Sequence, residues 1–252
     1  MSRRHRGGRL DDRKILETII RLHKRIAERF PGSGLASVCG TLADVARVTA
    51  SRAAALAQPY WSFRLLAGAV VALGLAAQIY FALLIDWSGI IARAKPVEVA
   101  EGLDAIVNLL VLAFGGIWFV MTLEQRWKRR RVLAHLYEFR SLAHIVDMHQ
   151  LTKDPTIVLS GAPATASSPE RRMSEFELSR YLDYCSEMLA LIAKLAALYA
   201  ERTDDREVAT GVNEIEELTS NLGRKIWQKI MIVRRLDERH AGHTGHPTLR
   251  TH

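Results

Sequence analysis

Two long apolar runs dominate the pattern of hydrophobic and polar positions along the chain. The first covers 21 residues from Leu65 to Ile85 without a formal charge, and the second covers 19 residues from Ala105 to Leu123. At about 1.5 Å per helical residue, each run extends roughly 28–31 Å, which matches a hydrocarbon core of about 30 Å. The pattern therefore predicts two transmembrane helices within residues 64–123, joined by a short external loop. Two core helices of a soluble protein are the alternative, but soluble helices are seldom apolar on every face.

The residues before the first run have the period of amphipathic helices. Apolar residues recur every three or four positions over residues 15–30 and again from Leu35, and a Pro-Gly-Ser-Gly break lies between them. Residues 1–63 are therefore expected to form a cytoplasmic helical hairpin. We prefer the interpretation that its apolar stripe packs on the C-terminal helices. The alternative is an amphipathic pair that lies on anionic lipid.

Beyond the second run, no helix breaker occurs before Pro155, so the membrane helix is predicted to continue into the cytoplasm. The composition of residues 154–172 then changes to Pro, Ser, Ala, Thr and Gly, which is typical of a flexible loop. Helical periodicity resumes at Ser174, which forms a capping box pattern with Glu177. A further helix is predicted to start at Asp204.

These helices are expected to form a three-helix, coiled-coil-like bundle over residues 124–238, followed by a disordered, His-rich tail at 239–252. Each helix has an apolar seam at spacings of three and four. The predicted seam residues are Val132, Leu136, Phe139, Ala143 and Val146 in the first helix, Leu178, Tyr181, Cys185, Met188, Ile192, Leu195 and Tyr199 in the second, and Val208, Val212, Ile215, Thr219, Leu222, Ile226, Lys229 and Val233 in the third.

The predicted fold class is an all-α membrane protein, in which a two-helix transmembrane hairpin carries a helical cytoplasmic bundle. Its charge indicates the orientation. The chain has 35 Lys and Arg against 27 Asp and Glu, net +8, and five cations lie within residues 126–131. Residues 86–104, between the runs, contain only Arg93 and Lys95 against four acidic residues. The positive-inside rule then places both termini on the cytoplasmic side of a cell (inner) membrane. The basic flanks are expected to contact anionic headgroups, and no nucleic acid is needed to explain them.

Small and amide residues within the runs are candidates for helix packing. Gly68, Ala72 and Ala76 recur every four residues, and small residues at this spacing let helix backbones approach closely, so this face is expected to pack on the second span or on another copy. Gln78 and Asn108 are expected to form hydrogen bonds between helices. The runs contain no charged residue, which argues against a proton-coupled transporter or pump.

Polar residues on the first bundle helix are the strongest candidates for chemistry. Arg140, His144 and Asp147 share one face of the predicted helix. His149 completes an HxxDxH pattern, but it lies about 140° from His144 at 100° per residue, so one unbroken helix does not present all three groups to one metal ion. A hydrogen-bonded polar stripe is the more common arrangement. No metal site or cofactor is therefore predicted.

The other two bundle helices carry matching polar stripes, which include Asp183, Glu187, Glu217 and Arg224. If the stripes meet, these residues form an ionic network with the stripe on the first helix. Such networks more often determine register and partner choice than catalysis. A ligand-sensing pocket would use the same residue types, and the two interpretations stay open.

No catalytic signature is present in the sequence. The chain has no phosphate-binding loop, dinucleotide fingerprint, nucleophile elbow or CxxC pair, and Cys39 and Cys185 are too isolated for a disulfide framework. We expect a non-catalytic scaffold, sensor or effector that acts as a homo-oligomer, with an unidentified cytoplasmic ligand or protein partner. The first alternative is an oligomeric pore. The second is a metal-dependent membrane enzyme that uses His144 and Asp147.

Overall fold

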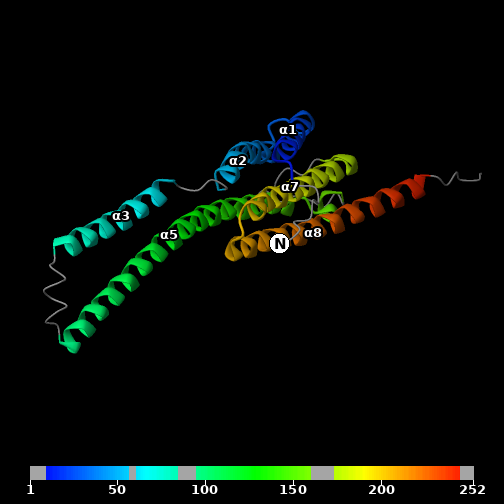
Figure 1. Cartoon of the computed structure of the whole chain (residues 1–252). Helices are drawn as coiled ribbons and strands as arrows, with labels where there is room; N and C mark the ends of the chain where they lie inside the picture. Colours follow the sequence, from blue (N-terminus) through cyan, green and yellow to red (C-terminus); the bar gives the residue numbers. More distant parts are fainter. Residues whose placement is uncertain (1–9, 57–60, 85–94, 160–172, 245–252) are drawn as a thin grey trace, which may run out of the picture. The chain divides into compact units, whose positions relative to one another are not determined.

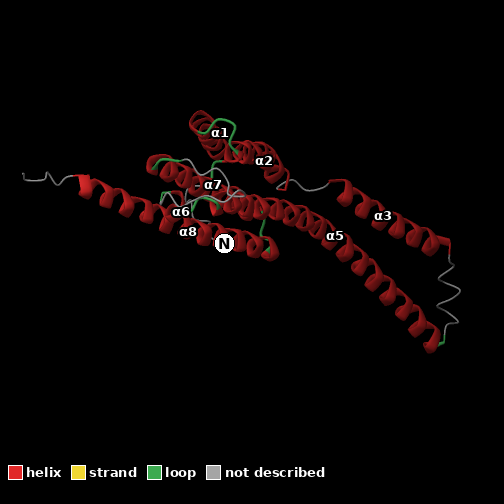
Figure 2. Ribbon diagram, turned by 180° about the vertical axis from the view of Figure 1, so that it is seen from behind, coloured by secondary structure: helices red, strands yellow, loops and turns green. Residues whose placement is uncertain are grey.

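The computed structural model is helical throughout the part of the chain that it describes, residues 10–56, 61–84, 95–159 and 173–244 (Figures 1 and 2). No strand occurs within these ranges, which confirms the all-α part of the predicted fold class. The helices are α1 (Asp12–Arg29), α2 (Gly34–Leu56), α3 (Trp61–Leu84), α5 (Pro96–Leu151), α6 (Pro155–Val158), α7 (Glu175–Arg202) and α8 (Arg206–Thr244).

The chain forms two compact units. The first, which we call the bundle unit, comprises Met1–Ala57 and Val132–His252, and the second, the apolar unit, comprises Gln58–Arg131. Helix α5 contributes residues to both, because it is a single helix of 56 residues. The N-terminal hairpin and the C-terminal helices therefore belong to one unit, although they lie at opposite ends of the sequence.

In the bundle unit, α1 and α2 form a hairpin that packs on α7. Ile15, Ile19, Leu22 and Ile26 are buried along one face of α1, as its period predicts. Phe30, in the turn after α1, packs edge-on against the ring of Tyr181 with centroids 5.4 Å apart. The apolar stripe of the hairpin is thus covered by protein.

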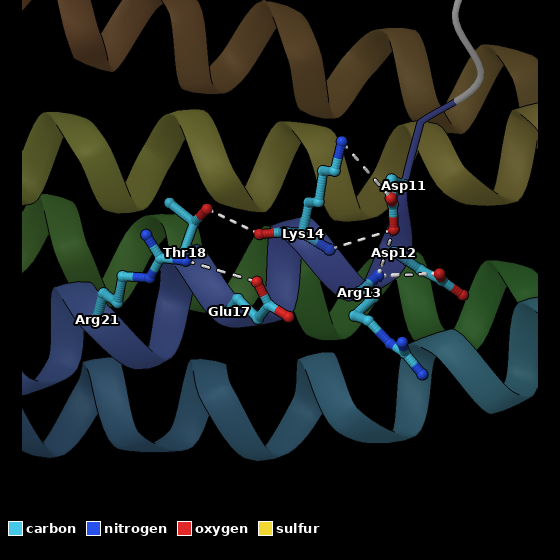
Figure 3. A network of polar contacts seen from close by, with 7 residues as sticks. All are labelled: Asp11, Asp12, Arg13, Lys14, Glu17, Thr18 and Arg21. Atoms are coloured by element: carbon cyan, nitrogen blue, oxygen red, sulfur yellow. Dashed lines mark hydrogen bonds and ion pairs between the residues drawn. The ribbon is translucent and has the colours of Figure 1, made fainter.

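The start of α1 is determined by its cap (Figure 3). The side chain of Asp11 accepts hydrogen bonds from the backbone N–H groups of Arg13 and Lys14, at 3.1 and 3.2 Å, and so satisfies two donors that have no partner within the helix. The ion pair between Arg21 and Glu17, also in Figure 3, is largely exposed and therefore adds little stability. The cap begins the helix, while the apolar face positions it.

The seams predicted for α5, α7 and α8 form the rest of this core. Every predicted seam residue is buried except Lys229, which is half-buried. Helices α7 and α8 lie side by side as a hairpin in both views (Figures 1 and 2). The predicted capping box is present at the start of α7, where Glu177 accepts a hydrogen bond from the Ser174 backbone N–H at 2.9 Å and its own N–H donates to Ser174 Oγ. The seam pattern thus predicts the core correctly.

Several helix ends differ from the sequence prediction. Helix α5 begins at Pro96, nine residues before the apolar run, because proline suits a first helical position and acidic residues favour the first turns. The short helix α6 starts within the predicted loop and is capped by Asp154. Helix α8 begins at Arg206 rather than Asp204 and continues to Thr244, since no proline interrupts it. Part of the predicted tail is therefore helical, and residues 245–252 lie outside the described ranges.

The apolar unit exposes its large hydrophobic side chains. No described side chain of α3 is buried, and Leu83 and Phe114 are 81% and 74% exposed. Within the described residues, one helix, Val99–Leu151, contains a stretch long and apolar enough to cross a membrane, and none of that stretch is buried in the protein. The apolar segment described in α3, Gly68–Tyr80, is shorter than a full span. A membrane-spanning helix at the first apolar run, in α3, therefore stays a prediction.

Candidate functional site

The structure does not bring the polar candidates on α5 into one site. Arg140 pairs with Glu214 of α8, with Nη2 and Oε2 2.5 Å apart. His144 is exposed, whereas Asp147 is half-buried and accepts a hydrogen bond from Gln150 Nε2 at 2.6 Å. These three residues share a helix face, as predicted, but they contact different partners.

The candidates on α7 and α8 are also separated. Glu187 accepts two hydrogen bonds from Arg25 of α1, at 2.5 and 3.4 Å, while Asp183 pairs with Arg180 of its own helix at 3.2 Å. Arg224 donates to Asn221 one turn earlier on α8, and Glu217 is exposed. The hypothesised network across three helices is therefore replaced by separate pairs, some within one helix and some between two helices. Sequence reasoning missed two of the partners, Glu214 and Arg25, and nothing local indicates that α1 packs on α7.

The HxxDxH residues do not form a metal site in the structure. The half-buried ring of His149 lies against Gly34 at the start of α2, so closely that a Cβ added to Gly34 would overlap it. Among the described residues, no group of three or more His, Cys, Asp and Glu side chains is arranged to hold a metal ion. His149 thus packs the hairpin against α5.

A buried polar contact that the sequence analysis missed joins the end of α5 to α8. We call it the α5–α8 joint, and it consists of Asp147, Gln150 and Lys229. Lys229 Nζ donates to the backbone oxygen of Gln150 at 2.9 Å and to its Oε1 at 2.6 Å, and Gln150 is only 2% exposed. Desolvation by burial lowers the pKa of Lys229, and the carboxylates of Asp154 and Asp147 partly offset this effect. An ammonium group here complements the negative end of α5.

A second polar cluster joins α2 to α5 and α7. Arg52 lies 3.0 Å from His135 Nδ1 and 3.6 Å from Glu138, and the imidazole ring of His135 stacks on Tyr199 with centroids 6.0 Å apart. Burial raises the pKa of Tyr199, although the nearby Thr49 and Arg52 side chains lower it in part. The hydroxyl itself is buried and makes no hydrogen bond of normal geometry.

Both cysteines are inert in this environment. Cys39 and Cys185 are fully buried, and desolvation raises the pKa of each thiol from 9 to about 12. A nucleophilic cysteine needs a thiolate near neutral pH, which requires the opposite shift. The thiols therefore belong to the packed core.

The apolar unit contains an open groove between α3 and α5, with a volume of about 700 Å³. Gly74, Ala77 and Gln78 of α3 line it. The predicted small-residue stripe does not line this groove. Ala76 lies two positions from Gly74 and from Gln78, which is about 200° around the helix, and Gly68 and Ala72 lie on the same face of the helix as Ala76.

Asn108 of α5 also lies outside the groove lining. Its amide nitrogen donates to Asp104 Oδ2, one turn earlier, at 3.3 Å. The prediction that the small-residue stripe packs on the second span therefore does not describe the arrangement within this unit, and its alternative, another copy, stays a prediction.

A comparison of the chain with protein families, curated proteins and solved structures finds no match. The polar groups described above hold helix ends and hairpins together, whereas many large apolar side chains of α3 and of the first half of α5 are exposed.

Proposed function

We propose that this chain is a non-catalytic integral membrane protein, a scaffold, sensor or effector whose cytoplasmic bundle is anchored by two membrane-spanning helices. One observation carries the proposal. The apolar stretch of α5 is long enough to cross a bilayer, and none of it is buried by the protein. Soluble monomers rarely expose apolar patches of more than a few hundred Å², so this surface needs a covering, and hydrocarbon is the covering that its length matches.

The charge distribution supports the orientation within this proposal. Five cations lie within residues 126–131, close after the apolar stretch of α5, and the residues before α3 are also basic. Such flanks stay on the cytoplasmic side and contact anionic headgroups. Both termini of a protein in the cell (inner) membrane are then cytoplasmic, and the short loop between the two spans faces the outside.

The shared helix suggests how such a protein would act. Because α5 is one helix from Pro96 to Leu151, its last turns carry seam residues of the bundle, while its first half carries the apolar stretch. A ligand or protein that changed the packing of the bundle would therefore act on the same helix that crosses the membrane. The ion pairs of the bundle and the α5–α8 joint fit a role in determining helix register and the choice of partner. We propose a homo-oligomer as the functional form.

Membrane fractionation with a matched pair of variants tests the proposal. Phe114 lies at the centre of the second apolar run and is 74% exposed. In lipid, Phe114→Arg would cost about 2.5–3.5 kcal/mol at the helix centre, whereas Phe114→Leu would cost almost nothing. We expect the wild type and Phe114→Leu to stay in the pellet after carbonate extraction, and the amount of inserted Phe114→Arg to fall severalfold.

A water-exposed surface would behave in the opposite way. Phe114→Arg would then be harmless and would increase solubility, and the wild type would appear in the supernatant without detergent. Reporter fusions after Thr244 test the orientation separately. A reporter active only in the cytoplasm should work there, and one active only outside should not.

A further inference from the structure

Gln78 is a polar residue in a groove that is otherwise apolar. It lines the open groove between α3 and α5 together with leucine, valine, glycine and alanine side chains. No hydrogen bond links its amide to any other residue of the described part of the chain. Asn108, the amide in the other run, is already bonded to Asp104 on its own helix. Gln78 thus has two donor hydrogens and an acceptor that form no hydrogen bond within the described part of the chain.

In the membrane proposed above, the position of Gln78 makes an unpaired amide costly. Gln78 is three residues from the midpoint of the run Leu65–Ile85, or about 4.5 Å along the helix axis. Water is absent at that depth, so an unpaired amide carries its full desolvation penalty. A lipid tail that filled the groove would offer neither a donor nor an acceptor.

The groove is also shaped for a close helix contact. Gly74 and Ala77 lie on its α3 side, and Ala113 and Gly116 lie on its α5 side. Gly74 and Ala113 are each within one residue of the midpoint of their own apolar run. Small residues therefore occur on both walls at mid-membrane depth, where they allow a third backbone to approach.

We propose that α3 of a second copy of this chain occupies the groove, with Gln78 of each copy hydrogen-bonded to Gln78 of the other. An amide both donates and accepts, so it pairs with its own equivalent across a two-fold axis. Each copy places its α3 in the groove of the other, which has a volume of about 700 Å³, and each amide then donates one hydrogen bond and accepts one. This inference rests on the proposed function and specifies the surface through which the membrane unit dimerises.

Cysteine cross-linking in membranes tests the surface. Ala77 and Ala76 are adjacent and exposed alanines, but Ala77 lines the groove and Ala76 lies about 100° further around the helix, outside the lining. The native thiols of Cys39 and Cys185 are buried and stay silent. With copper phenanthroline as oxidant, we expect Ala77→Cys to give at least fivefold more disulfide-linked dimer than Ala76→Cys.

Each other outcome has a definite meaning. Equal or stronger cross-linking of Ala76→Cys would assign the contact to the small-residue stripe and overturn the inference. Membrane-bound protein that does not cross-link at either position would overturn the inference while leaving the proposed function intact. Protein that fails to sediment with membranes would overturn both.

Substitution of Gln78 tests the amide pair itself. Leucine is a common residue in both runs, so Gln78→Leu does not threaten insertion or folding. Interhelical hydrogen bonds in membranes typically account for a three- to tenfold change in affinity. We therefore expect the dimer dissociation constant of Gln78→Leu, measured by energy transfer in liposomes, to rise about three- to tenfold. Gln78→Asn should recover part of the loss, and an unchanged or lower constant for Gln78→Leu would refute the pairing.

Discussion

Replacing Lys229 by methionine tests whether the α5–α8 joint stabilises the bundle. The substitution keeps an unbranched side chain but removes the donor that lies 2.9 Å from the backbone oxygen of Gln150 and 2.6 Å from its Oε1. The backbone oxygen keeps the hydrogen bond from the Lys153 N–H at 3.1 Å, so Oε1 is the acceptor that loses its donor, and a buried acceptor without a partner costs about 1–3 kcal/mol. Removal of an ammonium group whose pKa is lowered by desolvation returns part of this. We expect a net loss of about 1–3 kcal/mol, and a melting temperature lower by roughly 3–10 °C.

A double-mutant cycle isolates the contact. Gln150→Met removes the Oε1 acceptor of the Lys229 ammonium group but keeps the backbone oxygen of residue 150, whereas the double variant removes both side-chain partners, which is less harmful than removing either one. Thermal unfolding of the full chain in detergent, followed by circular dichroism, should show the double variant about 1–2 kcal/mol more stable than the sum of the single losses. Losses that add within about 0.5 kcal/mol would refute the joint. Since the folded pKa of Lys229 is lowered, its contribution to stability increases as the pH rises from that lowered pKa to 10.5, and it is constant below the lowered pKa.

Three further predictions concern individual residues of the bundle unit. Tyr199→Phe should leave stability unchanged or raise it by up to about 1 kcal/mol, because the buried hydroxyl lacks a hydrogen bond; a clear loss in thermal unfolding would contradict this. With pKa values of about 12, the thiols of Cys39 and Cys185 should react with iodoacetamide at pH 8 about a thousandfold more slowly in the native than in the unfolded chain, and rapid labelling of the native chain would show that the thiols are accessible. The free energy of unfolding should also fall as the pH rises from 9 to about 12. Gly32→Ala should lower the free energy of unfolding by about 1–2 kcal/mol, because the φ angle of Gly32 is +69°. Gly223→Ala, at an open helical position, should raise it by about 0.5–1 kcal/mol. If chemical denaturation showed Gly32→Ala to be the more stable of the two variants, the backbone argument would be refuted.

The core was predictable because burial imposes a period on the sequence. Every apolar seam residue of the three bundle helices is buried, and the capping box at Ser174 forms as its pattern predicts. These features depend on residues three or four positions apart. They are therefore readable without knowledge of the tertiary structure.

The contacts between helices were less predictable, because they depend on which faces meet. Nothing near Glu187 indicates that Arg25, more than 150 residues earlier, would be its partner. The α5–α8 joint did leave a signal, since Gln150 continues the spacing of the α5 seam and Lys229 was itself a predicted seam position. A polar residue on an apolar seam indicates a buried partner on the facing helix. The periodicity of α3 likewise did not show whether Gly68 or Gly74 would face α5.

The way the N-terminal hairpin is attached determines what can detach it. Ile19, Leu22 and Ile26 are completely buried, while the ion pair between Arg25 and Glu187 is partly open to solvent. At 1 M salt, where the screening length is about 3 Å, that pair loses most of its value, but burial of the isoleucine and leucine side chains does not weaken. Changes in ionic strength therefore leave the hairpin in place. A regulator that releases the hairpin has to offer a hydrophobic surface that competes for the same isoleucine and leucine side chains.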